Sequence, residues 1–118
     1  MRKKLYKVKK SNIHRRGLYA SKDIKSGTKI IQYKGKIISV KETERNPKFN
    51  NDKSIYLFNL TKKYDLDGDF KYNTARLINH SCDPNCEVDG IGFKLWIYAI
   101  RDRKKGEELS YDYGFSYD

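Results

Sequence analysis

The apolar residues of this chain come in short runs with a β-strand pattern, and no segment shows a long helical period. The strongest run is FKLWIYAI (93–100), whose Trp, Tyr and Ile residues suit a strand that is buried on at least one face. Two further candidates are KIIQYKGKII (29–38), with a Gly in its middle, and SIYLFNL (54–60). We therefore expect one mostly β domain that spans residues 1–118.

Turn signals and two short helical segments complete this pattern. Asp89-Gly90 comes just before the strongest strand, where a hairpin turn would lie, and Asp67-Gly68 marks another turn after the run that ends at residue 60. Ser39 and Glu42 match a capping box, so we expect a short helix after Ser39 that ends at the following proline. A second helical turn is expected near Thr74.

Two stretches of the chain resemble each other. ASKDIKSGTKI (20–30) and AIRDRKKGEEL (99–109) share the positions of an Ala, an Asp and a Gly. In both, a strand is expected to end in a turn that needs Gly, after which a second strand begins. The echo predicts one small β unit used twice within the domain.

The composition is strongly basic, with a formal net charge of +11. This favours an anionic partner such as nucleic acid, a membrane surface or a charged ligand, although a solvated basic surface would explain it as well. Only the start, RKKLYKVKK, is dense in lysine, and no apolar stretch is long enough to span a membrane. Two Cys are too few for a disulfide scaffold and favour a reducing compartment.

RLINHSCDPNC (76–86) contains several residues of the types that bind metals or act in catalysis. His80, Cys82 and Cys86 could bind zinc, but zinc usually takes four ligands and the only other His is His14, so a metal site is not expected. Cys82 could be a nucleophile with His80 as its base, but residues this close in sequence are not expected to meet in the required geometry. The preferred interpretation is a buried Cys and a His that is hydrogen-bonded in a turn.

Two further segments have features of a binding site. In GEELSYDYG (106–114), Tyr111 and Tyr113 would share one face of a strand, where their two hydroxyls could act as hydrogen-bond partners in an enclosed pocket. In RRGLYA (15–20), Gly17 permits close approach of the backbone to a ligand. Taken alone, an ordinary edge strand and a simple turn explain these two segments equally well.

In combination, however, these segments resemble the motifs of SET-domain protein lysine methyltransferases. RRGLYASKDIKSGTKIIQYKG, YLFNL, RLINHSCDPN and GEELSYDYG follow one another in the order of that family, over residues 14–114. The resemblance implies several small, curved β-sheets with a knot-like crossing near the C-terminal end. It also implies S-adenosyl-L-methionine as the cofactor and a protein lysine side chain as the substrate.

The resemblance also implies the site residues. For the cofactor they are His14, Arg15, Arg16, Gly17, Tyr56, Arg76, Asn79 and His80. Tyr113 matches the catalytic Tyr of the family, and Tyr111 matches a position that holds Tyr or Phe. The residues expected to line the substrate channel are Tyr33, Tyr56, Tyr111 and Phe115. A hydroxyl at position 111 takes space in the channel and predicts mono- or dimethylation.

The chain also departs from the family pattern. Many relatives carry a Cys-rich tail that binds zinc together with the Cys at position 82, whereas this sequence stops at GFSYD. We expect no metal, no Cys-rich leader or tail, and a channel closed by Phe115 and Tyr117 or by a second subunit in a homodimer. This pattern is typical of a minimal, stand-alone SET protein of viral or bacterial type.

The substrate expected from the family is a histone or another basic, nucleic-acid-binding protein. The location would be the cytoplasm in a bacterium, and the nucleus or chromatin in a eukaryotic host. The net charge of the chain would repel a basic tail unless acidic groups at Asp65, Asp67, Asp69 or Asp112 offset it locally. The alternative is a SET-like module that no longer turns over and binds nucleic acid through its basic surface.

Overall fold

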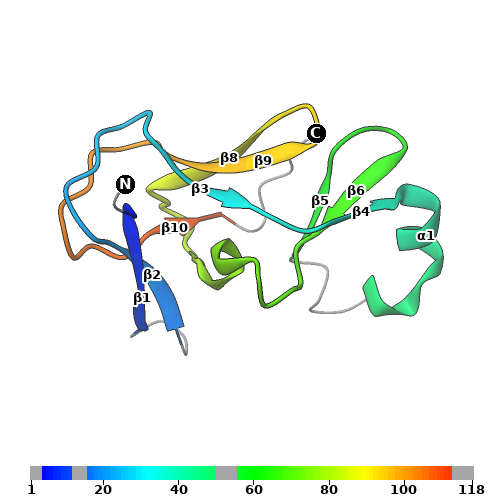
Figure 1. Cartoon of the computed structure of the whole chain (residues 1–118), viewed down its shortest axis with the longest axis horizontal. Helices are drawn as coiled ribbons and strands as arrows, with labels where there is room; N and C mark the ends of the chain where they lie inside the picture. The colour runs from blue at the N-terminus through cyan, green and yellow to red at the C-terminus, as the bar shows by residue number, and fades with distance from the viewer. Residues whose placement is uncertain (1–3, 12–15, 50–55, 113–118) are drawn as a thin grey trace.

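The computed structural model describes residues 4–11, 16–49 and 56–112, and in these ranges most of the chain is β-strand and turn (Figure 1). The described strands form four small sheets of two or three strands each, which confirms the expected mostly β fold. All pairings are antiparallel except one. None of the helices in these ranges is long and apolar enough to cross a membrane.

The strands of the second and third sheets lie side by side in Figure 1. The first sheet pairs β1 (Tyr6–Lys10) with β2 (Arg16–Ala20). The second has the order β3 (Lys29–Tyr33), β9 (Lys94–Ala99) and β8 (Cys86–Ile91). The third has the order β4 (Lys36–Ser39), β6 (Tyr64–Asp67) and β5 (Leu57–Asn59). The fourth pairs β7 (Asn79–His80) with β10 (Ser110–Tyr111) in parallel.

The apolar run 29–38 is two strands in different sheets. The chain leaves the second sheet after Tyr33 and enters the third at Lys36. Gly35 lies at the crossing, where a Cβ atom would come within 2.1 Å of the backbone oxygen of Asp67. The glycine in the middle of the run is therefore needed for the close approach of two backbones.

The predicted turn at Asp89-Gly90 is wrong, because both residues lie inside β8. The hairpin between β8 and β9 reverses at Gly92, which has a φ of 62°. Asp89 accepts a hydrogen bond from the Gly90 amide on its own Oδ1 at 2.8 Å, and the strand continues. At Asp67-Gly68 the chain does leave β6 in a local turn, in which Asp67 accepts a hydrogen bond from the Asp69 amide at 3.0 Å. The hairpin between β5 and β6 reverses earlier, at residues 61–63.

Both helical predictions are confirmed. Helix α1 (Val40–Arg45) begins after Ser39, whose hydroxyl accepts a hydrogen bond from the Glu42 amide at 3.2 Å. The 3-10 helix η1 (Pro47–Phe49) follows it, and the helical turn near Thr74 is the 3-10 helix η3 (Thr74–Leu77). α1 and η1 lie between β4 and β5 of the third sheet, and η3 connects the third sheet to β7 of the fourth.

The two echoing segments form one unit, because they pair with each other side by side at the left of Figure 1. Ile24 and Arg103 exchange two backbone hydrogen bonds of 2.7 Å at its centre. We call residues 20–28 and 99–107 the double turn. The prediction of a β unit used twice is therefore confirmed, with the addition that the two copies hold each other.

The double turn has an approximate two-fold symmetry. Gly27 donates from its amide to the carbonyl of Ala99 at 2.7 Å, and Gly106 donates in the same way to the carbonyl of Ala20 at 2.8 Å. Both glycines have a positive φ, 88° and 93°, a region that residues with side chains rarely adopt. The two glycines that match in the sequence comparison thus adopt the same backbone conformation and make equivalent hydrogen bonds.

The core lies between the double turn and the third sheet. Its members with 0–1% exposure come from different sheets and connect them: Leu18, Ala20, Tyr33, Ala75, Ile78, Cys86, Leu95, Ile97, Ala99 and Leu109. Because Ile78 and Leu109 are anchored in this core, the residues that follow each of them, β7 and β10, are held in place next to each other.

Candidate functional site

The parallel pair of β7 and β10 brings the two most distinctive motifs together. Asn79 lies opposite Ser110, and His80 lies opposite Tyr111. The backbone amide of Ser81 also donates to the carbonyl of Tyr111 at 3.2 Å. The Asn-His motif and the Tyr motif, far apart in the sequence, therefore form one continuous surface, as the resemblance implies. The two segments that the resemblance places at the knot-like crossing are thus side by side.

A single carboxylate, that of Glu108, joins this pair to the first sheet. It accepts hydrogen bonds from the Ser11 hydroxyl at 2.9 and 3.0 Å, from Nδ2 of Asn79 at 2.8 Å, and from the Tyr19 hydroxyl at 3.3 Å. Charge-assisted hydrogen bonds of this kind are among the stronger ones in proteins. We call Glu108 and its three partners the Glu108 cluster.

Sequence analysis missed Glu108. In GEELSYDYG the tyrosines are the residues with a clear site pattern, and Glu107 and Glu108 are equivalent by sequence. The signal that separates them is their place before the buried Leu109: Glu108 accepts hydrogen bonds from the site, whereas Glu107 points to Arg103 at 2.9 Å. The burial of Leu109, which distinguishes the two carboxylates, comes from the structure.

The predicted residues Arg16 and Gly17 lie against the same cluster. Asn79 donates from Nδ2 to the backbone oxygen of Arg16 at 3.1 Å. A Cβ atom on Gly17 would lie 2.4 Å from Oε2 of Glu108 and 3.0 Å from Nδ2 of Asn79. A side chain at position 17 would therefore displace the Glu108 carboxylate and the Asn79 amide from their present positions. Four predicted cofactor residues are thus brought together by the structure: Arg16, Gly17, Asn79 and His80.

The side chain of His80 contacts two potential partners. Its Nε2 lies 3.3 Å from Sγ of Cys82, and its Nδ1 lies 3.7 Å from Oδ1 of Asp112. The expectation that His80 and Cys82 would not meet is therefore wrong, because the bend at residues 82–83 folds the thiol back toward the ring. The expected hydrogen-bonded His is observed, and its ring is partly exposed.

The two cysteines have different environments, and both are free thiols. Cys82 is exposed, whereas Cys86 is 1% exposed and burial raises its pKa to about 12. The expected buried Cys is thus Cys86. Within residues 4–11, 16–49 and 56–112, no group of three His, Cys, Asp or Glu side chains is arranged to hold a metal ion.

Tyr111 is 5% exposed and lines a cavity of about 130 Å³ beside the strand pair. The ring of Phe58 forms another wall, with its centroid 6.3 Å from that of Tyr111. The other lining residues are mostly apolar: Pro84, Cys86, Glu87, Val88, Ile100 and Asp112. An apolar cavity next to the Asn-His motif could hold a methylene chain and exclude water from its end.

Tyr33 lies behind the Phe58 wall of this cavity and contacts the backbone of Tyr56. Tyr33 is 1% exposed, its ring packs edge-on against Phe58 at 4.7 Å, and its hydroxyl donates to the backbone oxygen of Tyr56 at 3.0 Å. Tyr33 therefore supports the Phe58 wall from inside the core. Arg76, on η3, donates from Nε to the carbonyl of Phe70 at 2.9 Å.

Several predicted residues lie outside the described part of the chain. For the cofactor these are His14 and Arg15, and for catalysis and the channel they are Tyr113 and Phe115. Tyr117, expected to help close the channel, is in the same position. Their roles stay predictions.

Two of the acidic residues expected to attract a basic tail serve the fold instead. Asp65 is 6% exposed and accepts hydrogen bonds from Thr43 at 2.7 Å and from Asn59 at 2.8 Å. Asp67 is also buried, and it accepts from the Asp69 amide at 3.0 Å. Asp112, at the edge of the cavity, is the member of this group that lies at the site.

The SET domain family model matches residues 15–114, so the chain belongs to the SET domain family. This match covers each of the motifs that meet around β7 and β10. A chain of an apo ctPRC2 structure, whose title names mutations in Ezh2, is similar in fold with a TM-score of 0.77 and 33% identity. The likeness covers 94% of this chain and 15% of that one.

The curated relatives are much longer proteins. The chain is 40% identical to "Histone-lysine N-methyltransferase trithorax" of Drosophila virilis, over 94% of this chain and 3% of the relative. It is 42% identical to "Histone-lysine N-methyltransferase set1" of Dictyostelium discoideum, over 97% of this chain and 8% of the relative. For the human "Histone-lysine N-methyltransferase 2D" the identity is 37%, over 92% and 2%. The chain thus matches a small part of each relative.

Proposed function

We propose that the protein transfers a methyl group from S-adenosyl-L-methionine to the side-chain nitrogen of a protein lysine. The observation that carries the proposal is the parallel pairing that sets Asn79-His80 against Ser110-Tyr111, beside an apolar cavity. The family and the printed names of its relatives support the same reaction.

The residues around Glu108 suit the amino-acid end of this cofactor. Gly17 keeps a backbone surface close to the strand pair, and a Cβ atom there would fill that space. Nδ2 of Asn79 is held by Arg16 and Glu108, which orients the amide, and its Oδ1 makes no hydrogen bond within the described part of the chain. An oriented amide oxygen is a suitable acceptor for an ammonium group.

In this proposal the other family positions complete the cofactor site, namely His14, Arg15, Tyr56, Arg76 and His80. The bound cofactor supplies a methyl group that is activated by its positive sulfur. The chain's own task is to hold that group and the lysine in line, so that alignment supplies much of the rate.

The lysine must reach the cofactor as a neutral amine. Its pKa in water is about 10.4, so a proton has to leave before the nitrogen can attack. Burial against Tyr111 and Phe58 disfavours the ammonium form by desolvation, whereas Glu87 and Asp112 on the same lining favour it, so the proton is lost only as the nitrogen moves past them toward the positive sulfur. We assign the catalytic role to Tyr113 and the control of channel width to Tyr111, and aromatic rings at this site also suit a methylated ammonium.

The substrate we propose is a histone or another basic protein that binds nucleic acid, which places the protein at chromatin in a eukaryotic host. The names of the relatives, all histone-lysine methyltransferases, support this choice. A second subunit in a homodimer would be another way to close the substrate channel. The mass of the protein in solution tests whether it forms a dimer.

Calorimetry with S-adenosyl-L-methionine tests the cofactor site. Wild type should bind it in a one-to-one ratio, and Asn79→Ala should bind it at least about 10-fold more weakly, because the loss of one oriented acceptor to a charged group costs about 1.5 kcal/mol or more. Asn46→Ala, after α1, serves as the control and should bind like wild type. A folded wild type that binds no cofactor would remove the basis of the proposal.

Incubation with labelled cofactor and a cell lysate then identifies the substrate. Transfer to lysine in one or a few proteins supports the proposal and names the protein and the residue. Label on a nucleic acid, or on protein residues other than lysine, contradicts it.

A further inference from the structure

The excess positive charge of the molecule is concentrated in one region. We call residues 4–11, 16–28 and 99–109 the basic end. It holds eleven Lys and Arg residues and four acidic ones, whereas the rest of the described chain holds eleven and nine. Most of the net positive charge of the described chain therefore lies at the basic end, where it would attract an anionic partner.

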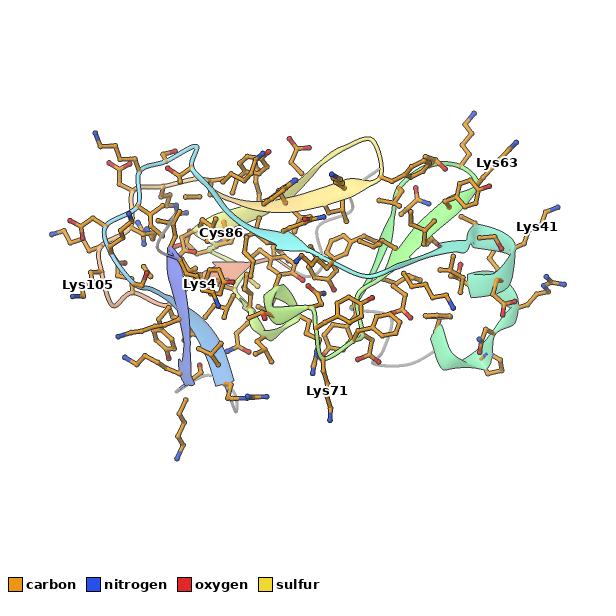
Figure 2. The ribbon with its side chains drawn as sticks, viewed as in Figure 1. Lys4, Lys41, Lys63, Lys71, Cys86 and Lys105 are labelled. Atoms are coloured by element: carbon orange, nitrogen blue, oxygen red, sulfur yellow. The ribbon has the colours of Figure 1, made fainter. Side chains whose placement is uncertain are left out.

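The basic end lies far from the third sheet. Lys105 lies at one end of the long axis in Figure 2, and Lys41 and Lys63 lie at the other. The molecule extends 42 Å along this axis and 29 and 28 Å across it. At physiological salt, where charges are screened over about 8 Å, the two ends present separate fields to a partner.

The acidic residues of the basic end are engaged within the fold. Asp23 accepts a hydrogen bond from the Lys105 amide at 2.9 Å, and Asp102 accepts one from the Ser26 amide at 2.8 Å. These two contacts are equivalent under the approximate two-fold symmetry of the double turn. Each carboxylate is thereby held against the backbone of the opposite turn.

The other two carboxylates of this end are engaged as well. Glu107 accepts from Arg103 and from the Lys104 amide at 2.9 and 2.7 Å, and Glu108 lies in its own cluster. The lysines of both turns, by contrast, are exposed: Lys22, Lys25, Lys104 and Lys105. Asp23 and Asp102 are exposed as well, but their carboxylates are hydrogen-bonded to backbone amides, whereas these lysine side chains extend into solvent.

Strand β1 extends the same surface. Lys7, Lys9 and Lys10 are exposed on it, and Lys4 precedes it. The ammonium of Lys9 lies 4.8 Å from the centre of the Tyr19 ring, and that of Lys4 lies 5.8 Å from the centre of the Tyr6 ring. Lysines held on a strand and on rigid turns lose less freedom on binding than lysines on a disordered tail.

We propose that the basic end binds the phosphate backbone of duplex DNA without sequence preference. Its cations are mostly lysines on strands and turns, which suit point contacts to phosphates. The described part of this end contains no amphipathic helix that would lie in a membrane surface. Binding to DNA is independent of the proposed methyl transfer, and it would hold the protein on the nucleic acid that carries a histone substrate.

Fluorescence anisotropy with a labelled duplex of about 30 base pairs, without cofactor, tests this proposal. The test variant changes Lys22, Lys25, Lys104 and Lys105 to Glu. The matched control changes Lys41, Lys62, Lys63 and Lys71 to Glu, which alters the net charge equally outside the basic end. The side chains of Lys104 and Lys105 can be changed because only their backbone amides hold the double turn.

The test variant should bind duplex DNA at least about 10-fold more weakly than wild type at about 100 mM salt, and the control by no more than about 3-fold. Affinity of wild type should fall steeply with salt, and the slope should be smaller in the test variant. If the Glu variant does not fold, as judged by circular dichroism, the same four positions changed to Gln replace it.

Three outcomes would overturn the proposal. They are equal losses in the two variants, no binding of DNA by wild type, and tighter binding to single-stranded RNA or to anionic lipid vesicles than to duplex DNA. Because cofactor calorimetry is a separate measurement, failure of DNA binding leaves the proposed enzyme activity untouched, and the reverse also holds.

Discussion

The double turn and the Glu108 cluster lie next to each other and are stabilised in different ways. The double turn is held by backbone hydrogen bonds that occur twice, once in each half. The Glu108 cluster depends on side chains that converge on one carboxylate. The first region should therefore tolerate most side-chain changes, and the second should not. Substitutions in the two regions should therefore have unequal effects, and the largest effect of all is expected at the catalytic position proposed above.

Tyr113→Phe should have the largest effect. Removal of the hydroxyl should lower turnover by about 100-fold or more, as for loss of one preorganised polar group at a reacting centre. Affinity for S-adenosyl-L-methionine should change little. The measurement is single-turnover methyl transfer together with calorimetry, and full activity in the variant would remove the role we give to this residue.

Glu108→Ala should destabilise the protein by about 2–3 kcal/mol, because several polar side chains lose their charged acceptor. Glu107→Ala, its neighbour in the double turn, should cost less than about 1 kcal/mol, since its ion pair with Arg103 is at the surface. Urea unfolding of both variants measures the difference. Equal costs would show that the cluster has no special place in the fold.

Substitutions of three glycines distinguish the cost of backbone strain from the cost of a steric clash. Gly27→Ala and Gly106→Ala should each cost about 1–2 kcal/mol from positive φ alone, and by similar amounts, because no atom lies within 4 Å of the added Cβ. Gly17→Ala should cost more and should also weaken cofactor binding, since its Cβ would collide with Glu108. Unfolding and calorimetry check this, and unequal costs at Gly27 and Gly106 would contradict the symmetry.

Tyr111→Phe should change the product more than the rate. Without the hydroxyl the channel has more room, so the fraction of higher methylation states should rise. Mass spectrometry of the modified substrate measures this fraction. A variant that yields only monomethyl-lysine would argue against the role of position 111.

Cys82 and Cys86 should differ in reactivity. At about pH 8 an exposed thiol reacts with a disulfide reagent, so Cys82 should be labelled quickly and Cys86 only on unfolding. Because burial raises the pKa of Cys86 from 9.0 to about 12, the folded state keeps a proton that the unfolded state loses. Its contribution to stability is complete below pH 9 and should decrease between pH 9 and about pH 12. Cys86→Ala should flatten this decrease.

The sequence allowed good predictions where a local pattern determines the structure. Ser39 with Glu42 predicted α1, the run 93–100 predicted β9, and the echo of 20–30 in 99–109 predicted two equivalent turns, although not their pairing with each other. In each case the relevant interactions are made by neighbours in the chain or by the backbone itself.

The failures concern contacts that depend on tertiary structure. Glu108 cannot be told from Glu107 until Leu109 is known to point into the core. Likewise, Asp89-Gly90 is a strong hairpin signal, but the register of β8 with β9 places the reversal at Gly92. The contact of His80 with Cys82 depends on a bend that spacing alone does not predict.

The most direct test of the central claim is the mass of purified core histones after incubation with the protein and S-adenosyl-L-methionine. The account predicts added methyl groups on lysine with wild type and nearly none with Tyr113→Phe. A folded wild type that binds the cofactor but adds no methyl to histones, and labels no lysine in a cell lysate, would contradict it.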